Sequence, residues 1–147
     1  MDRPITNKSY RVPNQMFFEI IESELKTGKS VKFNVAGSSM LPFLKDSDQV
    51  VIKQPNLSDV KIGDILLVKY EGKFILHRLV KISNGEYYLA GDGNLDQIER
   101  VSEADVLALV VKGFRGKREL KVNNKLNKRL GLVWYYIRPL RYLINKF

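Results

Sequence analysis

The chain of 147 residues contains no cysteine and only one histidine, His77. The absence of cysteine excludes disulfides, thiol nucleophiles and zinc sites built on thiolates, and a single histidine excludes a histidine-rich metal cluster. We therefore expect no metal and no cofactor. Any reaction that needs an imidazole has only His77 to use.

Long apolar runs are also missing. No segment reaches the roughly 18 to 20 apolar residues that a membrane-spanning helix needs, and the first 30 residues lack the uninterrupted apolar stretch of a secretory signal. The length and the 44% hydrophobic content suit one globular domain. We expect a cytoplasmic protein without a transmembrane span, whose only membrane contact would be peripheral.

Acidic residues are scarce near the C-terminus. Residues 112–147 contain 11 Lys and Arg but only one acidic residue. Residues 1–111 contain 14 Lys and Arg and 15 Asp and Glu. This basic surplus favours an anionic partner, either a membrane surface or a nucleic acid. A nucleic acid is the weaker alternative, because neither a helix-turn-helix nor an aromatic RNA-binding motif accompanies the charge.

The periodicity of the apolar residues predicts one helix followed by a small β-domain. Residues 14–27 predict a helix that ends at Gly28, with the apolar stripe Met16, Phe17, Ile20, Ile21 and Leu25. Short β-rich runs follow at residues 31–36, 49–54, 64–70, 73–82, 86–90 and 106–114. Tight turns between them favour a mainly β fold with flanking helices (α+β), a compact coiled β half-barrel, over a parallel α/β sheet.

Three regions are expected along the chain. Residues 1–30 form an N-terminal helical segment that packs on the core, residues 31–115 form the β-domain, and residues 116–147 form a basic amphipathic tail. The tail begins with a polar connector and continues at residue 125 with helical spacing, which Pro139 interrupts.

The helical part of the tail has two interpretations, which the sequence leaves open. Its apolar stripe comprises Leu126, Leu130, Val133, Trp134, Ile137, Leu140 and Ile144, and its cations include Lys125, Lys128, Arg129, Arg138 and Arg141. Such a segment is suited to lying on an anionic membrane surface. An ordinary C-terminal helix that packs its stripe on the β-domain has the same pattern.

The stretch "GSSMLP" between the first two β-runs contains two adjacent serines. Taken alone, it is typical of a Gly-Ser turn between strands. A serine acts as a nucleophile only when a neighbouring base removes its proton, and imidazole suits this task near neutral pH. His77, in "KFILHRLVKI", is the available imidazole. A lone histidine on a strand more often has a structural role, so whether His77 is a catalytic base must be judged from the neighbouring motifs.

In order along the chain, "GSSMLP", "KIGDILLV", "ILHRLV" and "GDGNLD" resemble the motifs of the signal peptidase I and SOS-repressor clan of serine peptidases. The resemblance covers roughly residues 31–114, and the four motifs in order are far more specific than any one of them. In that clan a Ser-Met-x-Pro loop carries the nucleophile and the base precedes an arginine. A histidine at the base position is similar to the endoplasmic-reticulum and sporulation-type branch.

The resemblance implies a serine endopeptidase that cleaves a peptide or protein precursor through an acyl-enzyme. Ser39 is then the nucleophile because it precedes Met40, and Ser38 is only its neighbour. His77 is the general base and Arg78 is structural. The alternative within the same family is a non-catalytic member that uses the β-cleft to bind an extended peptide by strand addition.

The third member of the site is expected in "GDGNLDQIER", which offers Asp92, Asp96 and Glu99. A triad needs a carboxylate that orients the histidine. The resemblance implies that an aspartate a few residues after Gly-Asp-x-Asn takes this role, so we expect it to be Asp96, although the spacing is shorter than in the family. We expect Asp92 to pair with Arg78. The alternative is a polar turn whose carboxylates are all solvated.

Two further features concern the oxyanion and the base. The family often has a serine two residues before the nucleophile, where this chain has Gly37, so the backbone N–H groups of Ser39 and Met40 are expected to stabilise the oxyanion. Lys69 and Lys81 are the alternative bases. Neither precedes the motif arginine, and a solvated position on a strand is the default interpretation of both.

Overall fold

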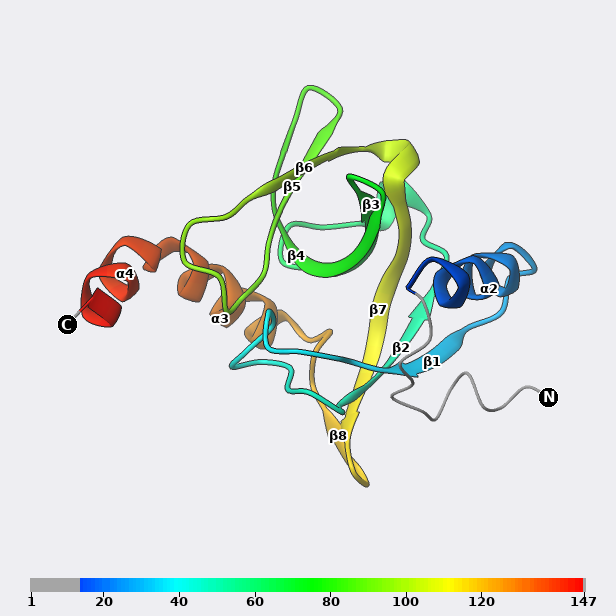
Figure 1. Ribbon diagram of the computed structural model, residues 1–147, viewed down its shortest axis with the longest axis horizontal. Coiled ribbons are helices and arrows are strands. Elements are labelled where there is room, and N and C mark those ends of the chain that lie inside the picture. Colours follow the sequence, from blue (N-terminus) through cyan, green and yellow to red (C-terminus); the bar gives the residue numbers. More distant parts are fainter. Residues whose placement is uncertain (1–13, 147) are drawn as a thin grey trace.

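The computed structural model describes residues 14–146, which form a curled, mainly antiparallel β half-barrel with three flanking helices, as the sequence predicts (Figure 1). The helices are α2 (Asn14–Lys26), α3 (Lys125–Tyr136) and α4 (Arg138–Lys146). The strands are β1 (Val31–Asn34), β2 (Gln49–Lys53), β3 (Ile65–Tyr70), β4 (Lys73–Ser83), β5 (Glu86–Ala90), β6 (Glu99–Ser102), β7 (Val106–Arg115) and β8 (Arg118–Leu120). Short 3-10 turns cover Leu57–Asp59 and Glu103–Asp105.

The strands are ordered β1-β2-β7-β3-β4-β5-β6, and β8 pairs with β7. All neighbouring pairs are antiparallel. The central strand β3 buries four consecutive residues, of which Ile65 and Leu67 enter one hydrophobic cluster and Leu66 and Val68 enter the other. Because alternate residues of a strand face opposite sides, β3 supplies core to both faces of the sheet.

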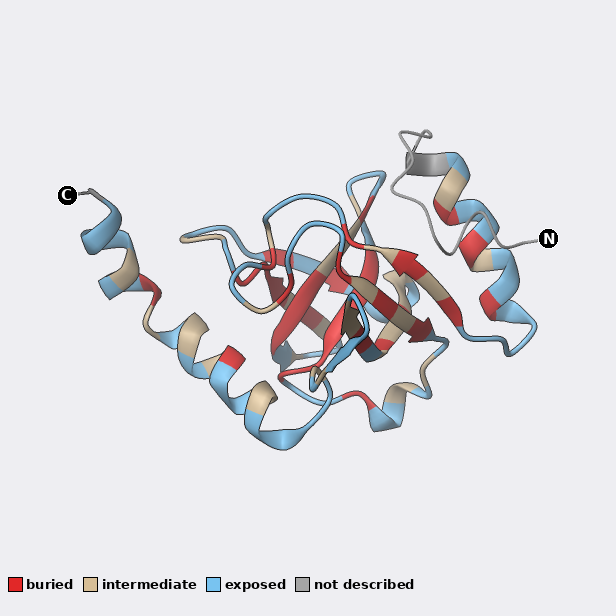
Figure 2. Cartoon of the chain, turned by 90° about the horizontal axis from the view of Figure 1, so that it is seen from below, coloured by how far each residue is buried: buried red, intermediate tan, exposed pale blue. Residues whose placement is uncertain are grey.

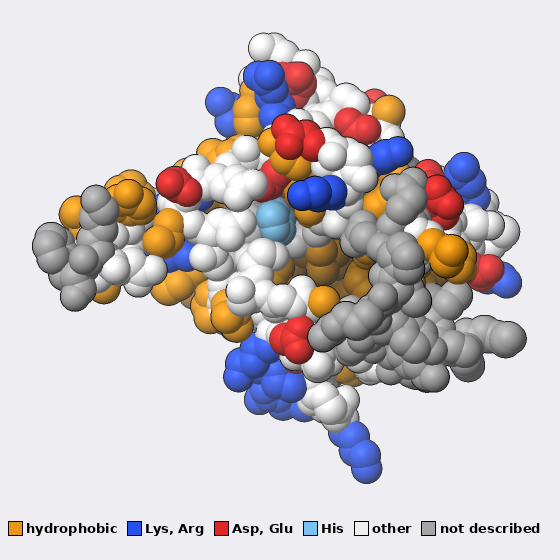
Figure 3. Space-filling model, viewed as in Figure 1, with side chains coloured by type: hydrophobic (Ala, Val, Ile, Leu, Met, Phe, Trp, Pro, Cys, Tyr) orange, Lys and Arg blue, Asp and Glu red, His pale blue; other side chains and the backbone are white. Residues whose placement is uncertain are grey.

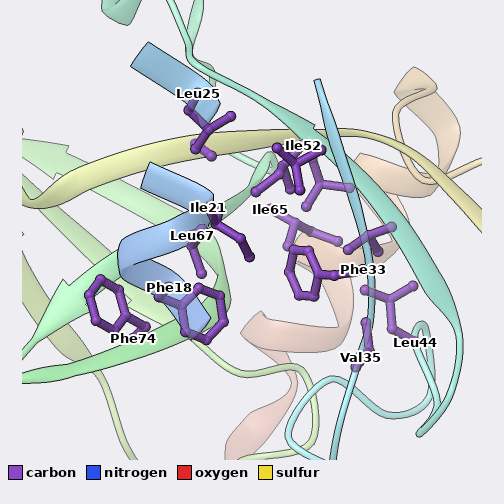
Figure 4. Packing of buried hydrophobic residues seen from close by; sticks show 14 of the residues in the cluster. Phe18, Ile21, Leu25, Phe33, Val35, Leu44, Ile52, Ile65, Leu67 and Phe74 are labelled. Carbon is purple, nitrogen blue, oxygen red and sulfur yellow. The ribbon is translucent and has the colours of Figure 1, made fainter. Parts of the chain in front are cut away.

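Helix α2 covers one of these clusters (Figure 4). Its buried face includes Phe18 and Ile21, and the Phe18 ring stacks on Phe74 of β4 with a centroid distance of 5.0 Å. The predicted stripe is wrong in part, since Met16 is 57% and Ile20 is 41% exposed. Helix α2 has apolar residues on more than one side, and only the side that packs on the sheet is buried.

The sequence did not predict β6 and β8. The four residues of β6 alternate between buried and exposed positions, and two of them are charged. The three residues of β8 lie inside the expected polar connector, where they pair with the end of β7. Both strands are held by a neighbour's backbone groups, which a single short segment does not reveal.

The C-terminal segment forms two helices that separate at Ile137, two residues before Pro139. This break is expected because proline lacks the backbone N–H that would continue the hydrogen bonds of α3, and because its ring clashes with the carbonyl four residues earlier. Helix α3 lies beside the sheet and α4 extends beyond it (Figure 2). None of the helices within residues 14–146 is long and apolar enough to cross a membrane.

Candidate active site

The loop between β1 and β2 holds Ser39. Gly37 has a φ of +88°, a conformation that glycine adopts without strain, and its N–H donates to Asp46 Oδ1 at 2.8 Å. Beyond it the chain turns, and the Leu41 N–H donates to the Ser38 carbonyl at 3.1 Å. The serine therefore lies at the start of a turn that its own loop braces.

A buried carboxylate fixes the far end of the same loop. Asp48 accepts two hydrogen bonds from the Arg115 guanidinium of β7, at 2.9 and 2.8 Å, and a third from the Lys45 N–H. Burial alone raises the pKa of Asp48, but these hydrogen bonds outweigh burial and leave the pKa below its ordinary value. The pair ties the loop to the central part of the sheet.

The only histidine lies on β4 and contacts a glutamate on β6. His77 Nδ1 and Glu99 Oε1 are 2.7 Å apart, and the two side chains are 7% and 1% exposed. Glu99 Oε2 is also buried and has no hydrogen-bond partner among the described residues. A buried carboxylate on Nδ1 favours the ring tautomer with its proton on Nδ1, which leaves Nε2 free to accept a proton.

The carboxylate at His77 is thus Glu99, and the expectation of Asp96 is wrong. Asp96 is exposed, whereas Glu99 is an inward-facing residue of β6. The alternating pattern of "ERVS", with Glu99 and Val101 on one side, was the available sequence signal. The signal is weak, because a charged residue at an inward-facing position is typical of a loop rather than of a strand.

Arg78, the residue after the histidine, points to the opposite side of β4 and is buried. Its guanidinium donates to both oxygens of Asp92, at 2.8 and 2.7 Å, and to the Gly63 carbonyl at 2.8 Å. The predicted pairing of these two residues is therefore present. Burial raises the pKa of Asp92, although Arg78, His77 and Arg141 each favour its charged form.

The glycine-rich turn after β5 packs directly on the serine loop. The Gly93 N–H donates to the Ser39 carbonyl at 2.8 Å. A Cβ atom on Gly91 would lie 2.7 Å from that carbonyl oxygen and 2.9 Å from His77 Nε2, and one on Gly93 would lie 2.7 Å from the Ser38 carbonyl oxygen. These glycines therefore allow the turn to pack against both the serine loop and the Nε2 side of the histidine ring.

The C-terminal helices hold the other side of this turn. The Trp134 Nε1–H and the Arg141 guanidinium both donate to the Asp92 carbonyl, at 2.9 and 2.7 Å. Arg138 donates to the carbonyls of Leu95 and Gln97. The sequence predicts these three residues on an amphipathic tail but not their contacts, because the backbone carbonyls that accept the hydrogen bonds are marked by no sequence pattern.

Helix α3 also approaches the buried arginine closely. A Cβ atom on Gly131 would lie 2.3 Å from Arg78 Cζ, so only glycine fits at this point of the helix. The aromatic ring of Phe43 covers the same guanidinium at 5.1 Å from its centroid. Arg78 thus connects the serine loop, the strand that carries His77 and the C-terminal helices.

Ser39 and His77 both border one cleft of about 270 Å³. Figure 3 shows the histidine beside a hollow with hydrophobic side chains around it. The remaining lining residues are Phe17, Phe18, Phe33, Asn34, Val35, Ala36, Met40, Leu67, Phe74, Ile75 and Leu76. Within residues 14–146 no three His, Asp or Glu side chains gather where they could hold a metal ion. The cleft is an apolar groove with a serine and a histidine at its border.

A known protein family matches most of the chain. No curated protein matches it. A family model described as Peptidase S24-like matches residues 2–111, a span that contains Ser39, His77 and Glu99 and ends within β7. This family lies in the clan of signal peptidase I and the SOS repressors, which confirms the resemblance at the level of the clan. Because the match covers well over half of the 147 residues, the chain belongs to the Peptidase S24-like family.

Proposed function

We propose that the protein is a serine endopeptidase of the histidine-dependent type that cleaves a peptide or protein precursor through an acyl-enzyme. Ser39 acts as nucleophile, His77 as general base and Glu99 as the residue that orients the base. The observation that carries the proposal is the 2.7 Å contact between His77 Nδ1 and Glu99 Oε1. The other ring nitrogen, Nε2, lies beside Gly91, in the turn that also contacts the Ser39 carbonyl.

The chemistry follows from this arrangement. Glu99 accepts a hydrogen bond from Nδ1–H, which leaves Nε2 unprotonated and able to take the proton of the Ser39 hydroxyl as its oxygen attacks the scissile carbonyl carbon. The imidazolium then gives this proton to the leaving amine, and the peptide bond breaks. A water molecule, deprotonated by Nε2, then attacks the ester carbonyl carbon, and the imidazolium gives this proton to the Ser39 oxygen as the ester bond breaks.

The oxyanion that forms in each attack needs hydrogen-bond donors. The N–H groups of Ser39 and Met40 lie at the start of the turn in which Leu41 bonds back to Ser38, so they do not belong to the hydrogen bonds that close the turn. We assign the oxyanion to these two amides. The Gly37 N–H is already engaged by Asp46, which leaves it a structural role.

The environment of the lysines supports histidine as the base. Lys69 and Lys81 are exposed, and their ammonium groups lie over the rings of Phe74 and Tyr88 at 6.0 and 5.1 Å from the centroids. A lysine that acts as a base must be largely deprotonated, which burial favours and solvent exposure does not. His77 is buried and borders the cleft.

One observation favours a second candidate, a non-catalytic peptide-binding protein. Strand β1 lies at the edge of the sheet, and Phe33 and Asn34 from this strand line the cleft. An extended peptide could therefore pair with β1 and insert alternate side chains into the groove without being cleaved. This candidate needs the cleft but neither Ser39 nor His77.

A serine-reactive probe separates the two candidates. The intact protein is treated with a fluorophosphonate, and the modified residue is located by mass spectrometry. We expect an adduct on Ser39 that is absent in Ser39→Ala and strongly reduced in His77→Ala, whereas Ser38→Ala is the matched control and keeps it. A protein that stays unmodified, or that reacts equally well without His77, contradicts the catalytic proposal and favours peptide binding.

A further inference from the structure

Helix α4 has its polar and apolar sides reversed relative to an ordinary surface helix. Arg138 is only 7% exposed and Arg141 is half-buried, and both guanidinium groups bind backbone carbonyls of the protein. Leu140, Leu143 and Ile144 face solvent with 56%, 55% and 65% of their surface exposed. A surface helix normally buries its apolar stripe and exposes its charges. The reversal means that an apolar side of α4 lies uncovered.

Helix α3 has a second exposed apolar stripe. Its members are Leu126, Leu130, Val133 and Tyr136, which are between 46% and 66% exposed. Their spacing of four, three and three residues places them on one side of the helix. The other side holds Gly131, which is packed on Arg78, and Trp134, which bonds to the Asp92 carbonyl. Both helices therefore direct apolar residues away from the β-domain.

We propose that the outward side of α3 and α4 is a docking surface for an anionic lipid membrane. Here this surface is called the apolar face, comprising Leu126, Leu130, Val133, Tyr136, Leu140, Leu143 and Ile144. Figure 3 shows hydrophobic side chains gathered at the end of the molecule where α4 projects in Figure 1. The face rests on residues outside the matched family region, which ends at residue 111.

The charge of the segment selects an anionic membrane as the occupant. Residues 125–147 contain six Lys and Arg and no acidic residue. Three of these cations have internal roles, because Lys128 pairs with Asp64 at 2.6 Å and the two arginines of α4 bind carbonyls. Lys125 and Arg129 remain exposed on α3. A surface with apolar residues and nearby cations binds anionic lipid both by burying the apolar side chains and by electrostatic attraction of the cations to the headgroups.

A second copy of the chain fits this surface less well. Pairing two apolar faces would bring two segments of the same positive charge together without any acidic residue to compensate. A lipid surface supplies both the acyl boundary that covers leucine and isoleucine and the negative headgroups that offset the cations.

Vesicle co-sedimentation of the intact protein tests the proposal. Vesicles of phosphatidylcholine alone are compared with vesicles that also contain phosphatidylglycerol, at low and high salt. We expect binding to the anionic vesicles that salt weakens. The double variant L143S/I144S should lower the binding constant by roughly a hundredfold, about tenfold for each buried aliphatic side chain. The double variant K125Q/R129Q should lower it by roughly thirtyfold, about fivefold for each cation.

The matched control replaces two exposed isoleucines of the β-domain, Ile62 and Ile82, which are 44% and 41% exposed. I62S/I82S should bind vesicles as the wild-type protein does. Absence of binding to anionic vesicles, or equal losses in the control and in L143S/I144S, overturns the proposal. So does a concentration-dependent dimer in analytical ultracentrifugation that L143S/I144S abolishes, because a second copy then covers the face. These readouts are independent of Ser39 reactivity, so the docking surface and the peptidase activity fail separately.

Discussion

Replacing Glu99 by glutamine should change the tautomer of the only imidazole in the protein. In the wild-type protein the carboxylate oxygen lies 2.7 Å from His77 Nδ1, and its site is buried. The neutral ring should therefore carry its proton on Nδ1. In Glu99→Gln the amide oxygen accepts a hydrogen bond from Nδ1–H in one orientation, and the amide NH2 donates a hydrogen bond to an unprotonated Nδ1 in the other, so the selection of a tautomer weakens.

The size of the effect follows from the strength of the hydrogen bond. A hydrogen bond to a charged group contributes about 1.5 to 3 kcal/mol, against about 0.5 to 1.5 kcal/mol for a neutral one. The carboxylate thus favours the Nδ1–H tautomer by a factor of roughly 10 to 150. The amide favours it by roughly tenfold or less, and its reversed orientation favours the other tautomer. We expect more than about 90% Nδ1–H in the wild-type protein and a mixture in the variant.

The assay is nitrogen-15 NMR of the imidazole ring, whose two nitrogen shifts distinguish the tautomers of the neutral ring. Because His77 is the single histidine of the 147 residues, the spectrum contains one ring and needs no assignment and no substrate. Labelling of Ser39 by the fluorophosphonate is measured on the same samples. It should fall by up to about four orders of magnitude in Glu99→Gln, which is the loss expected when the orienting carboxylate of a triad becomes an amide.

The matched control is Asp96→Asn, which removes the exposed carboxylate that the sequence favoured for this role. It should leave both the ring spectrum and the labelling rate unchanged. A wild-type ring that carries its proton mainly on Nε2 would refute the reasoning. A change in Asp96→Asn equal to that in Glu99→Gln would refute the assignment of the carboxylate.

Two further predictions concern the packing and the loop anchor. Gly91→Ala places a methyl group 2.7 Å from the Ser39 carbonyl oxygen and 2.9 Å from His77 Nε2. It should therefore lower the unfolding free energy by about 1 to 3 kcal/mol and slow labelling of Ser39 by the probe by at least roughly tenfold. Unchanged labelling would contradict the described packing. Asp48→Asn should lower the unfolding free energy by about 2 kcal/mol at neutral pH. Because the folded pKa of Asp48 lies below its ordinary 3.8, the Arg115 pair contributes stability above that value and loses it as the pH falls through the folded pKa. The difference between wild type and variant in denaturant titrations should therefore narrow in acid, and a constant difference would argue against the pair.

The sequence alone determined the fold class, the clan and the approximate position of most elements. Six β-rich runs and the N-terminal helix follow from local periodicity, which each segment carries within itself. The break before α4 follows from Pro139, which has no backbone N–H to continue a helix in any surroundings. The order of four short motifs pointed to the clan that the family match confirms.

Only the tertiary structure decided which carboxylate lies on His77. The pairing of β4 with β5 and of β5 with β6 brings Glu99 to the ring and leaves Asp96 in solvent, although the two are three residues apart. Likewise, the carbonyls of residues 92–97 turn the arginines of α4 inward and its leucines outward. The spacing of apolar residues predicts that a helix has an apolar and a polar side. Which side faces the protein depends on contacts with residues far away in the sequence, which the helix sequence alone does not contain.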